Sequence, residues 1–201
     1  MIKKIITVLG ISALSFISLA AHADAAKDLE LKLIKIQSMD SKFSQVVIDE
    51  LGTEIDSSSG QFQLQRPMRF RWMVELPYEQ EIVSDGMSLW QFDRDIEQIN
   101  VSTLSDSFDN SPAALLSQSQ LDMAKDYAVA SLKGEDEDSY IFHLRPKAED
   151  ALFEVMIMEF KQDSLLAFKV KDNLGQTTLV EFSEQQYNQN FAESFFTFEI
   201  P

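Results

Sequence analysis

Residues 60–75 alternate between apolar and polar side chains, and this pattern restricts the stretch to extended backbone. The even positions are Gly60, Phe62, Leu64, Arg66, Met68, Phe70, Trp72 and Val74, and the odd positions are Gln61, Gln63, Gln65, Pro67, Arg69, Arg71, Met73 and Glu75. Because successive strand side chains point to opposite faces, the even set predicts one apolar face and the odd set one mostly polar face. Pro67 cannot donate to a strand ladder, so it indicates an edge or a bend. The stretch therefore predicts part of a β-sheet with one buried face.

Arg66 is the exception on the apolar face, and two interpretations stay open. Its side chain can snorkel to solvent at a bend. Alternatively, its guanidinium lies in an apolar concavity and donates to backbone carbonyls or water, since an unpaired buried charge is too costly. The carbonyls at the end of a short lid helix would suit this second role, because they lack helical partners and carry negative partial charge. Arg66 would then act as a latch that holds a lid shut until the cavity is filled.

The content of phenylalanine and methionine bears on whether such a cavity exists. The chain has 15 Phe and 8 Met, and both residue types suit irregular or changeable contents. An ordinary sheet core explains the same composition. Composition alone therefore leaves the cavity and the filled core as alternatives.

The rest of the chain predicts one helix followed mainly by strands. From Ala25 to about Met39, Leu29, Leu33 and Ile36 recur at helical spacing, Leu31 and Ile34 widen the stripe, and Asp24 or Asp28 can serve the positive N-terminal end. Strands are predicted from Gln45, around an Asp-Gly hairpin at Ser84–Gly86, at 140–145, 152–160, 165–171 and 177–183, and as a final strand at Phe195–Phe198. Ser111-Pro112 begins a short helix. One long curved antiparallel sheet with about three helical pieces accounts best for this order.

The first 23 residues read as a secretory signal peptide. A basic start at Lys3 and Lys4 precedes an apolar run, and Ala21-His22-Ala23 gives a small-x-small cleavage pattern. The alternative is a membrane anchor, but the run is shorter than the ~20 residues that a bilayer needs. Removing residues 1–23 leaves 178 of 201 residues and changes the net charge from -16 to -18. We expect an exported protein with a single domain at 24–201.

Composition and missing motifs exclude several classes of function. The acidity argues against nucleic acid, whose phosphates are held by Lys and Arg. The chain has no cysteine, which excludes disulfides, thiolate metal sites and a lipid-modified N-terminal cysteine. His143 would be the one histidine left after signal removal, on a predicted strand surface, and Glu135–Asp138 reads as a solvated turn. No hydrolase, nucleotide-binding or zinc-protease motif is present. We expect no catalytic residue, metal or cofactor, with a hydrolase as a distant alternative.

Several segments, in order and spacing, resemble one family over nearly the whole predicted mature chain. They are Gln65–Trp72, Pro77, Ile82–Gly86, Leu89–Asp93, Glu97-Gln98, Ser111–Ala113 with Leu115-Leu116, and Phe196–Pro201. Together they resemble the LolA family of periplasmic outer-membrane lipoprotein carriers. Three departures from the family pattern are mild: Phe62 for Leu, Phe92 for Tyr and Ser111 for Thr.

The resemblance implies an α+β, mainly β fold: a curved antiparallel sheet forming an incomplete half-open barrel, with helices as a lid over a hydrophobic cavity for acyl chains. The family's arginine falls on Arg66, which would bond backbone atoms near Leu33, Leu116 and Ser117 in the closed, empty state. The cavity residues would be Phe62, Leu64, Met68, Phe70, Trp72, Val74, Leu89 and Leu115. The implied role is that of a monomeric periplasmic chaperone that takes lipoproteins from the inner-membrane transporter LolCDE to the receptor LolB. Exposed Arg69 and Arg71 would be candidates for contacting an acidic rim of the transporter.

Two alternatives remain beside the carrier. LolB, or another anchored acceptor of similar fold, needs a lipidated cysteine that this chain lacks. A periplasmic lipid- or lipoprotein-sensing module of related fold, as in envelope-stress regulators, usually carries a second domain. The predicted mature length leaves no room for one.

Overall fold

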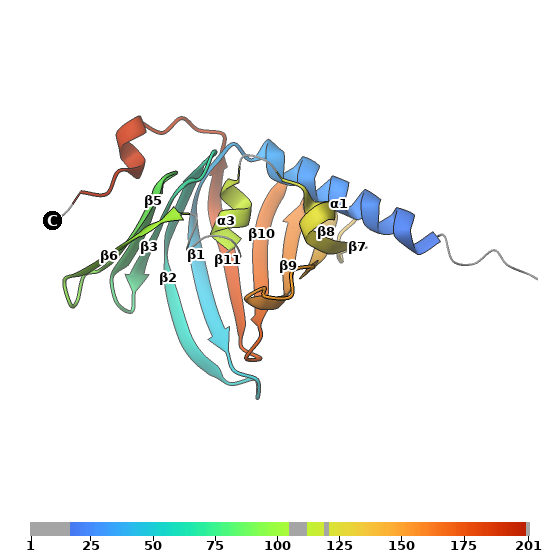
Figure 1. Ribbon diagram of the computed structural model, residues 1–201, viewed down its shortest axis with the longest axis horizontal. Coiled ribbons are helices and arrows are strands. Elements are labelled where there is room, and N and C mark those ends of the chain that lie inside the picture. The colour runs from blue at the N-terminus through green and yellow to red at the C-terminus, as the bar shows by residue number, and fades with distance from the viewer. Residues whose placement is uncertain (1–16, 105–111, 119–120, 200–201) are drawn as a thin grey trace, which may run out of the picture.

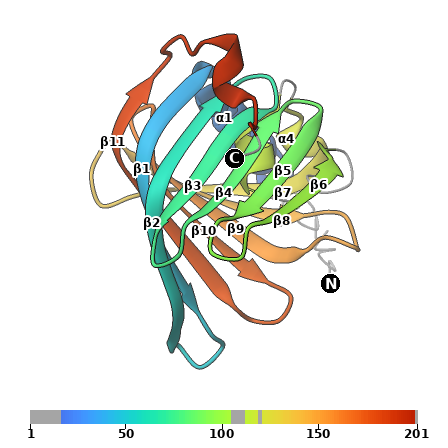
Figure 2. The ribbon, with the colours of Figure 1, turned by 90° about the vertical axis from the view of Figure 1, so that its left-hand side faces the viewer.

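The computed structural model describes residues 17–104, 112–118 and 121–199, and its main element is one eleven-stranded antiparallel sheet. The strand order is β6-β5-β4-β3-β2-β1-β11-β10-β9-β8-β7. Neighbouring strands in the sheet are thus mostly neighbours in sequence, and the two halves join where β1 meets β11. Figures 1 and 2 show that the sheet curves strongly and that β6 and β7 form its two edges. The predicted mainly β, incomplete half-open barrel is confirmed.

The helical elements other than the C-terminal one lie on the inner side of this sheet near one end (Figure 1). The strands are β1 Ser38–Ile48, β2 Glu54–Gln65, β3 Arg69–Leu76, β4 Gln80–Asp85, β5 Ser88–Asp93, β6 Gln98–Thr103, β7 Tyr127–Lys133, β8 Ser139–Pro146, β9 Phe153–Lys161, β10 Ser164–Asp172 and β11 Thr177–Tyr187. The helical elements are α1 Ile17–Lys35, α3 Pro112–Ser117, α4 Met123–Asp126 and the 3₁₀ turn η1 Glu193–Phe196. The Asp-Gly hairpin and the four strands predicted between 140 and 183 are confirmed, with slightly different bounds.

The alternating stretch folds into the β2–β3 hairpin. Phe62 pairs with Trp72 and Leu64 with Phe70, so even-numbered residues of both strands share one face. Phe62 and Leu64 are fully buried and Phe70 is 3% exposed, which confirms the apolar face. Residues 66–68 form the turn between the strands. The bend predicted from proline is therefore a chain reversal.

Helix α1 differs from its prediction at both ends and in the width of its apolar face. It begins at Ile17, so Asp24 lies inside the helix of the full-length chain and does not begin it. It ends at Lys35, because Met39 pairs with a β2 residue in the sheet. Leu31 and Ile34 are 45% and 44% exposed, so they do not widen the buried stripe. The buried face is narrower, because the helix meets the sheet along one side.

Some sequence predictions fall on the N-terminal and α3 regions. Residues 1–16 of the predicted signal peptide lie outside the described residues, as does Ser111 before α3. Residues 17–23 form the first part of α1. Among the described residues, no helix combines the length and the hydropathy that crossing a membrane requires.

The final strand predicted at the C-terminus is wrong. The segment forms η1, in which the Phe191 and Phe195 rings lie 4.8 Å apart and the Phe195 and Phe196 rings 5.1 Å apart. Phe198 then stacks on Trp90 at 6.3 Å. Strands β3, β4 and β5 are already paired on both sides, so these aromatic side chains pack on the sheet face instead of extending its edge.

Gly60 lies at a close approach of the two backbones in the β2–β3 hairpin. A Cβ added there would lie 1.8 Å from the carbonyl oxygen of Met73. Gly60→Ala is expected to lower the free energy of unfolding by about 3 kcal/mol, at the upper end of overpacking costs. Urea unfolding followed by circular dichroism measures this change. Gly52→Ala is the control, because Gly52 has φ +84° but no atom within 4 Å. It should lose only about 1 kcal/mol through left-handed backbone strain, and equal losses would contradict the steric account.

Candidate functional site

A cleft of about 660 Å³ lies on the inner face of the curved sheet. Its apolar lining comprises Phe70, Trp72, Val74, Pro77, Tyr78, Ile82, Leu89, Phe168 and Val170, and its polar lining Gln45, Asp56, Ser58, Glu79, Gln80, Asp93 and Thr178. These residues come from strands at both ends of the sequence, and the sheet order brings them together. The volume and the apolar character are those of a site for an apolar ligand.

Four of the eight residues expected to line a cavity line this cleft: Phe70, Trp72, Val74 and Leu89. The other four pack in the hydrophobic core: Phe62, Leu64 and Leu115 are at most 2% exposed, and Met68 packs against the core from the hairpin turn. In this structure they support the cleft and do not line it. Sequence reasoning missed the wall contributed by β10, Phe168 and Val170, because nothing in the local pattern links that strand to β3.

A chain of packed aromatic rings backs the two sides of the cleft. Trp72 lies 4.0 Å from Phe43 and 5.2 Å from Phe62, measured between ring centroids. Phe182 lies 5.7 Å from Phe62 and 5.7 Å from Phe168. Thus Trp72 and Phe168, on strands distant in sequence, rest on one continuous buried layer. Such packing makes the walls rigid.

The Arg66 guanidinium donates hydrogen bonds to backbone carbonyls of two covering segments. Nε donates to the Ile36 carbonyl at 2.8 Å, and one terminal nitrogen donates to the Leu33 carbonyl at 3.1 Å. The other terminal nitrogen donates to the Gln118 carbonyl. Burial lowers the pKa of Arg66 to about 10, because desolvation disfavours the charged form. The side chain therefore remains a cation at neutral pH and joins the C-terminal end of α1 to the residue after α3.

The expected partners of Arg66 are only partly those in the structure. The Leu33 carbonyl accepts from the guanidinium, but the Ser117 carbonyl accepts from the Met68 N–H, at 2.7 Å. The Leu116 side chain is 1% exposed and packs in the core. The Gln118 carbonyl directly follows Ser117 and the Ile36 carbonyl lies three residues after Leu33, so both are near the predicted positions, although neither residue was named. The one sequence signal for such acceptors is that carbonyls at helix ends lack intrahelical donors, and this applies to every helix.

Ser84 supports the turn that carries Arg66. It is fully buried, and its Oγ donates to the Met68 carbonyl at 2.8 Å and accepts from the Gly86 N–H at 3.2 Å. Ser84→Ala is expected to lower the free energy of unfolding by about 1–3 kcal/mol, because a buried carbonyl loses its donor. Thermal unfolding checks this. Ser183→Ala, on the exposed side of β11, is the control and should change stability by less than about 0.5 kcal/mol.

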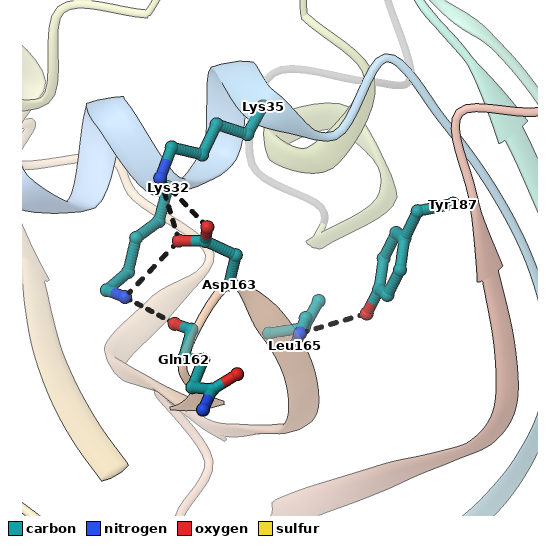
Figure 3. A network of polar contacts seen from close by, with 6 residues as sticks. All are labelled: Lys32, Lys35, Gln162, Asp163, Leu165 and Tyr187. Carbon is teal, nitrogen blue, oxygen red and sulfur yellow. Dashed lines mark hydrogen bonds and ion pairs between the residues drawn. The ribbon is translucent and has the colours of Figure 1, made fainter. Parts of the chain in front are cut away.

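Helix α1 is also attached to the β9–β10 turn (Figure 3). Lys35 donates to both carboxylate oxygens of Asp163 at 2.9 Å, and this bond lowers the pKa of the Asp163 carboxyl. Lys32 donates to the Gln162 carbonyl, and its ammonium lies 4.6 Å from the centroid of the Tyr140 ring. The Lys32 side chain is 14% exposed. Helix α1 is therefore attached to the sheet by these lysines in addition to Arg66.

The expectation that Arg69 and Arg71 are exposed is wrong. Both are half-buried under the C-terminal segment, with the Arg69 guanidinium 5.9 Å from the Phe196 ring and that of Arg71 5.4 Å from the Phe195 ring. Arg71 also forms an ion pair with Glu81 at 2.7 Å. These contacts, on the face opposite the cleft, occupy both arginines.

The fold and the cleft define a binding protein with an apolar site on the inner face of a curved sheet, and Arg66 joins two covering segments to that sheet. Among the described residues, no cluster of three or more His, Asp or Glu side chains could hold a metal ion. Residues 34–199 match the family described as outer membrane lipoprotein carrier protein LolA, and the chain belongs to this family.

Individual relatives agree with this membership. The chain is 36% identical over 181 residues to an outer-membrane lipoprotein carrier protein of Chromohalobacter salexigens, covering 90% of this chain and 85% of that protein. It is 34% identical over 199 residues to one of Alcanivorax borkumensis, covering 99% and 95%. An uncharacterized conserved protein from Thermus thermophilus shares the fold, with a TM-score of 0.54 at 13% identity over 88% of this chain and 93% of that one.

Proposed function

We propose that this protein is a periplasmic chaperone that carries lipoproteins by burying their acyl chains in the inner cleft. Removal of residues 1–23 on export would leave the carrier in the periplasm. It would accept lipoproteins from the inner-membrane transporter LolCDE and deliver them to the outer-membrane receptor LolB. The observation that carries the proposal is the apolar cleft between Trp72 and Phe168 in a chain of the LolA family.

The energetics of acyl chains make such a carrier necessary. At roughly 0.8 kcal/mol per buried CH₂, one chain in water represents on the order of 10 kcal/mol, and a lipoprotein carries more than one. Free transfer through an aqueous compartment would be too slow to be useful. A carrier must bury the chains and still release them, so part of the burial energy has to be offset.

We propose that Arg66 supplies this offset. In the structure its guanidinium bonds the Leu33, Ile36 and Gln118 carbonyls. Loading would separate these groups, and each hydrogen bond to a charged group contributes about 1.5–3 kcal/mol. Closing the lid again on release would restore them. The protein would act without covalent chemistry, as a monomer that binds one lipoprotein.

A two-step transfer assay tests the proposal. Proteoliposomes with LolCDE and a labelled lipoprotein are incubated with ATP and residues 24–201, and the supernatant is analysed after ultracentrifugation. We expect lipoprotein in the supernatant only with both ATP and carrier, and then its movement to liposomes that contain LolB. Supernatant lipoprotein that is equal with and without the carrier would refute the proposal.

A further inference from the structure

The charged residues that line the cleft are all acidic. Among the described residues of the lining, Asp56, Glu79 and Asp93 are acidic and none is Lys or Arg. The three carboxylates come from separate elements: β2, the β3–β4 connection and the end of β5. Asp56 and Glu79 are exposed, whereas the wall residue Phe70 is 3% exposed. The carboxylates therefore lie toward solvent and the aromatic wall lies deeper.

Among the ion pairs of the described residues, one involves a carboxylate of this set. Glu79 pairs with Arg94 at 3.3 Å, and both side chains are more than half exposed. The Asp93 carboxylate accepts from the Asp95 N–H at 3.2 Å. The ion pairs formed within the described ranges include neither Asp56 nor Asp93. Within those ranges, the solvent side of the cleft thus keeps two carboxylates without an ion-pair partner.

An apolar wall cannot distinguish two lipids with the same acyl chains. The difference between a membrane phospholipid and an acylated protein lies at the polar end, which must stay near solvent while the chains enter. An anionic phosphate at the solvent side of the cleft would experience the negative charge of Asp56 and Asp93, and repulsion between like charges would disfavour its binding. The acylated cysteine of a lipoprotein carries no phosphate and meets no such repulsion.

We infer that Asp56 and Asp93 make the cleft reject anionic phospholipids and thereby select acyl chains attached to an uncharged end. This inference rests on the proposed function, because it names what decides specificity at that same cleft. The two side chains determine specificity by charge and add little to affinity for lipoprotein.

The test compares two probes with identical palmitoyl chains: phosphatidylglycerol and an uncharged diacylglyceryl-cysteine peptide amide whose N-terminal amine is acetylated. Binding to residues 24–201 is measured by displacement of an uncharged fluorescent apolar dye, whose own affinity should not depend on the two carboxylates. The double variant Asp56→Asn/Asp93→Asn should bind phosphatidylglycerol about 5-fold more tightly at low salt and the peptide unchanged. The gain should shrink at high salt, where a charge effect is screened. Glu135→Gln/Glu137→Gln, in the exposed β7–β8 turn, is the control with the same change in net charge.

The outcomes separate the inference from the function. Two results would overturn selection by Asp56 and Asp93: a control variant whose affinity for phosphatidylglycerol rises as much as that of the cleft variant, or a cleft variant whose ratio of affinities for the two probes is unchanged. In either case, binding of the peptide would still support the carrier function. Failure of the wild-type protein to bind the peptide overturns the proposed function itself. Unchanged thermal unfolding of the double variant confirms that any difference arises in binding.

Discussion

Arg66→Leu is expected to accept lipoprotein from LolCDE as the wild type does but to pass it to LolB at least about tenfold more slowly. Leucine cannot donate to the Leu33, Ile36 and Gln118 carbonyls, so lid closure no longer favours release. Loss of even one such bond, worth about 1.5–3 kcal/mol, gives a change of this size. The amount of lipoprotein held by the carrier, followed over time after LolB is added, measures the effect.

Arg145→Leu provides the matched control, because Arg145 is an exposed arginine on β8. It should load and release at wild-type rates. Wild-type release by purified Arg66→Leu would contradict the role of Arg66 as a latch. Failure of Arg66→Leu to load would contradict it too, because the latch acts against loading.

Val170→Glu is expected to reduce lipoprotein capture by at least about tenfold. Val170 lines the cleft from β10. A carboxylate at this position would lose its hydrating water when acyl chains fill the cleft, and this desolvation is costly. The cost falls on the loaded state, since the empty cleft leaves the side chain half-exposed. Capture from LolCDE proteoliposomes, measured as lipoprotein in the supernatant, checks the expectation.

Leu166→Glu is the matched control on the same strand. Leu166 is 37% exposed and is not part of the cleft lining, so the same apolar-to-acidic change there should leave capture intact. Equal capture by both variants would show that acyl chains lie elsewhere. Thermal unfolding of each protein separates loss of capture from loss of fold.

The sheet was predictable from sequence because local alternation assigns each strand residue to one of the two faces. The β2–β3 hairpin is the clearest example: a three-residue turn keeps even-numbered residues of both strands on one face, so the pattern passes through the reversal unchanged. For the same reason the pattern could not distinguish one long bent strand from a hairpin. That distinction depends on pairing, which brings Gln65 opposite Arg69.

Strands β6 and β7 and the C-terminal segment were not predicted correctly, for two different physical reasons. Strand β6 is exposed on most of its length and β7 on its second half, so neither shows a strong apolar alternation. The phenylalanine-rich C-terminus has the composition of a strand but packs its rings on the outer face of the sheet. Its conformation is set by the aromatic surface that it meets and not by its own pattern.

The candidate site was also predictable only in part. Arg66 was found because one charge interrupts an apolar face, and such a charge needs partners. The sequence did not identify which carbonyls accept its hydrogen bonds, because any carbonyl at a helix end is a possible acceptor. Phe62 was predicted to line a cavity but is fully buried behind Trp72, since alternation fixes the face of a residue and not its depth. Depth depends on which distant strands close over it.

Native mass spectrometry of residues 24–201, recovered from the supernatant after incubation with LolCDE proteoliposomes, lipoprotein and ATP, tests the central claim most directly. The proposed function predicts a complex of one carrier with one intact triacylated lipoprotein, which disappears when ATP is omitted and which Val170→Glu forms poorly. Recovery of the carrier alone, or of a carrier with free lipid but no lipoprotein, would contradict it.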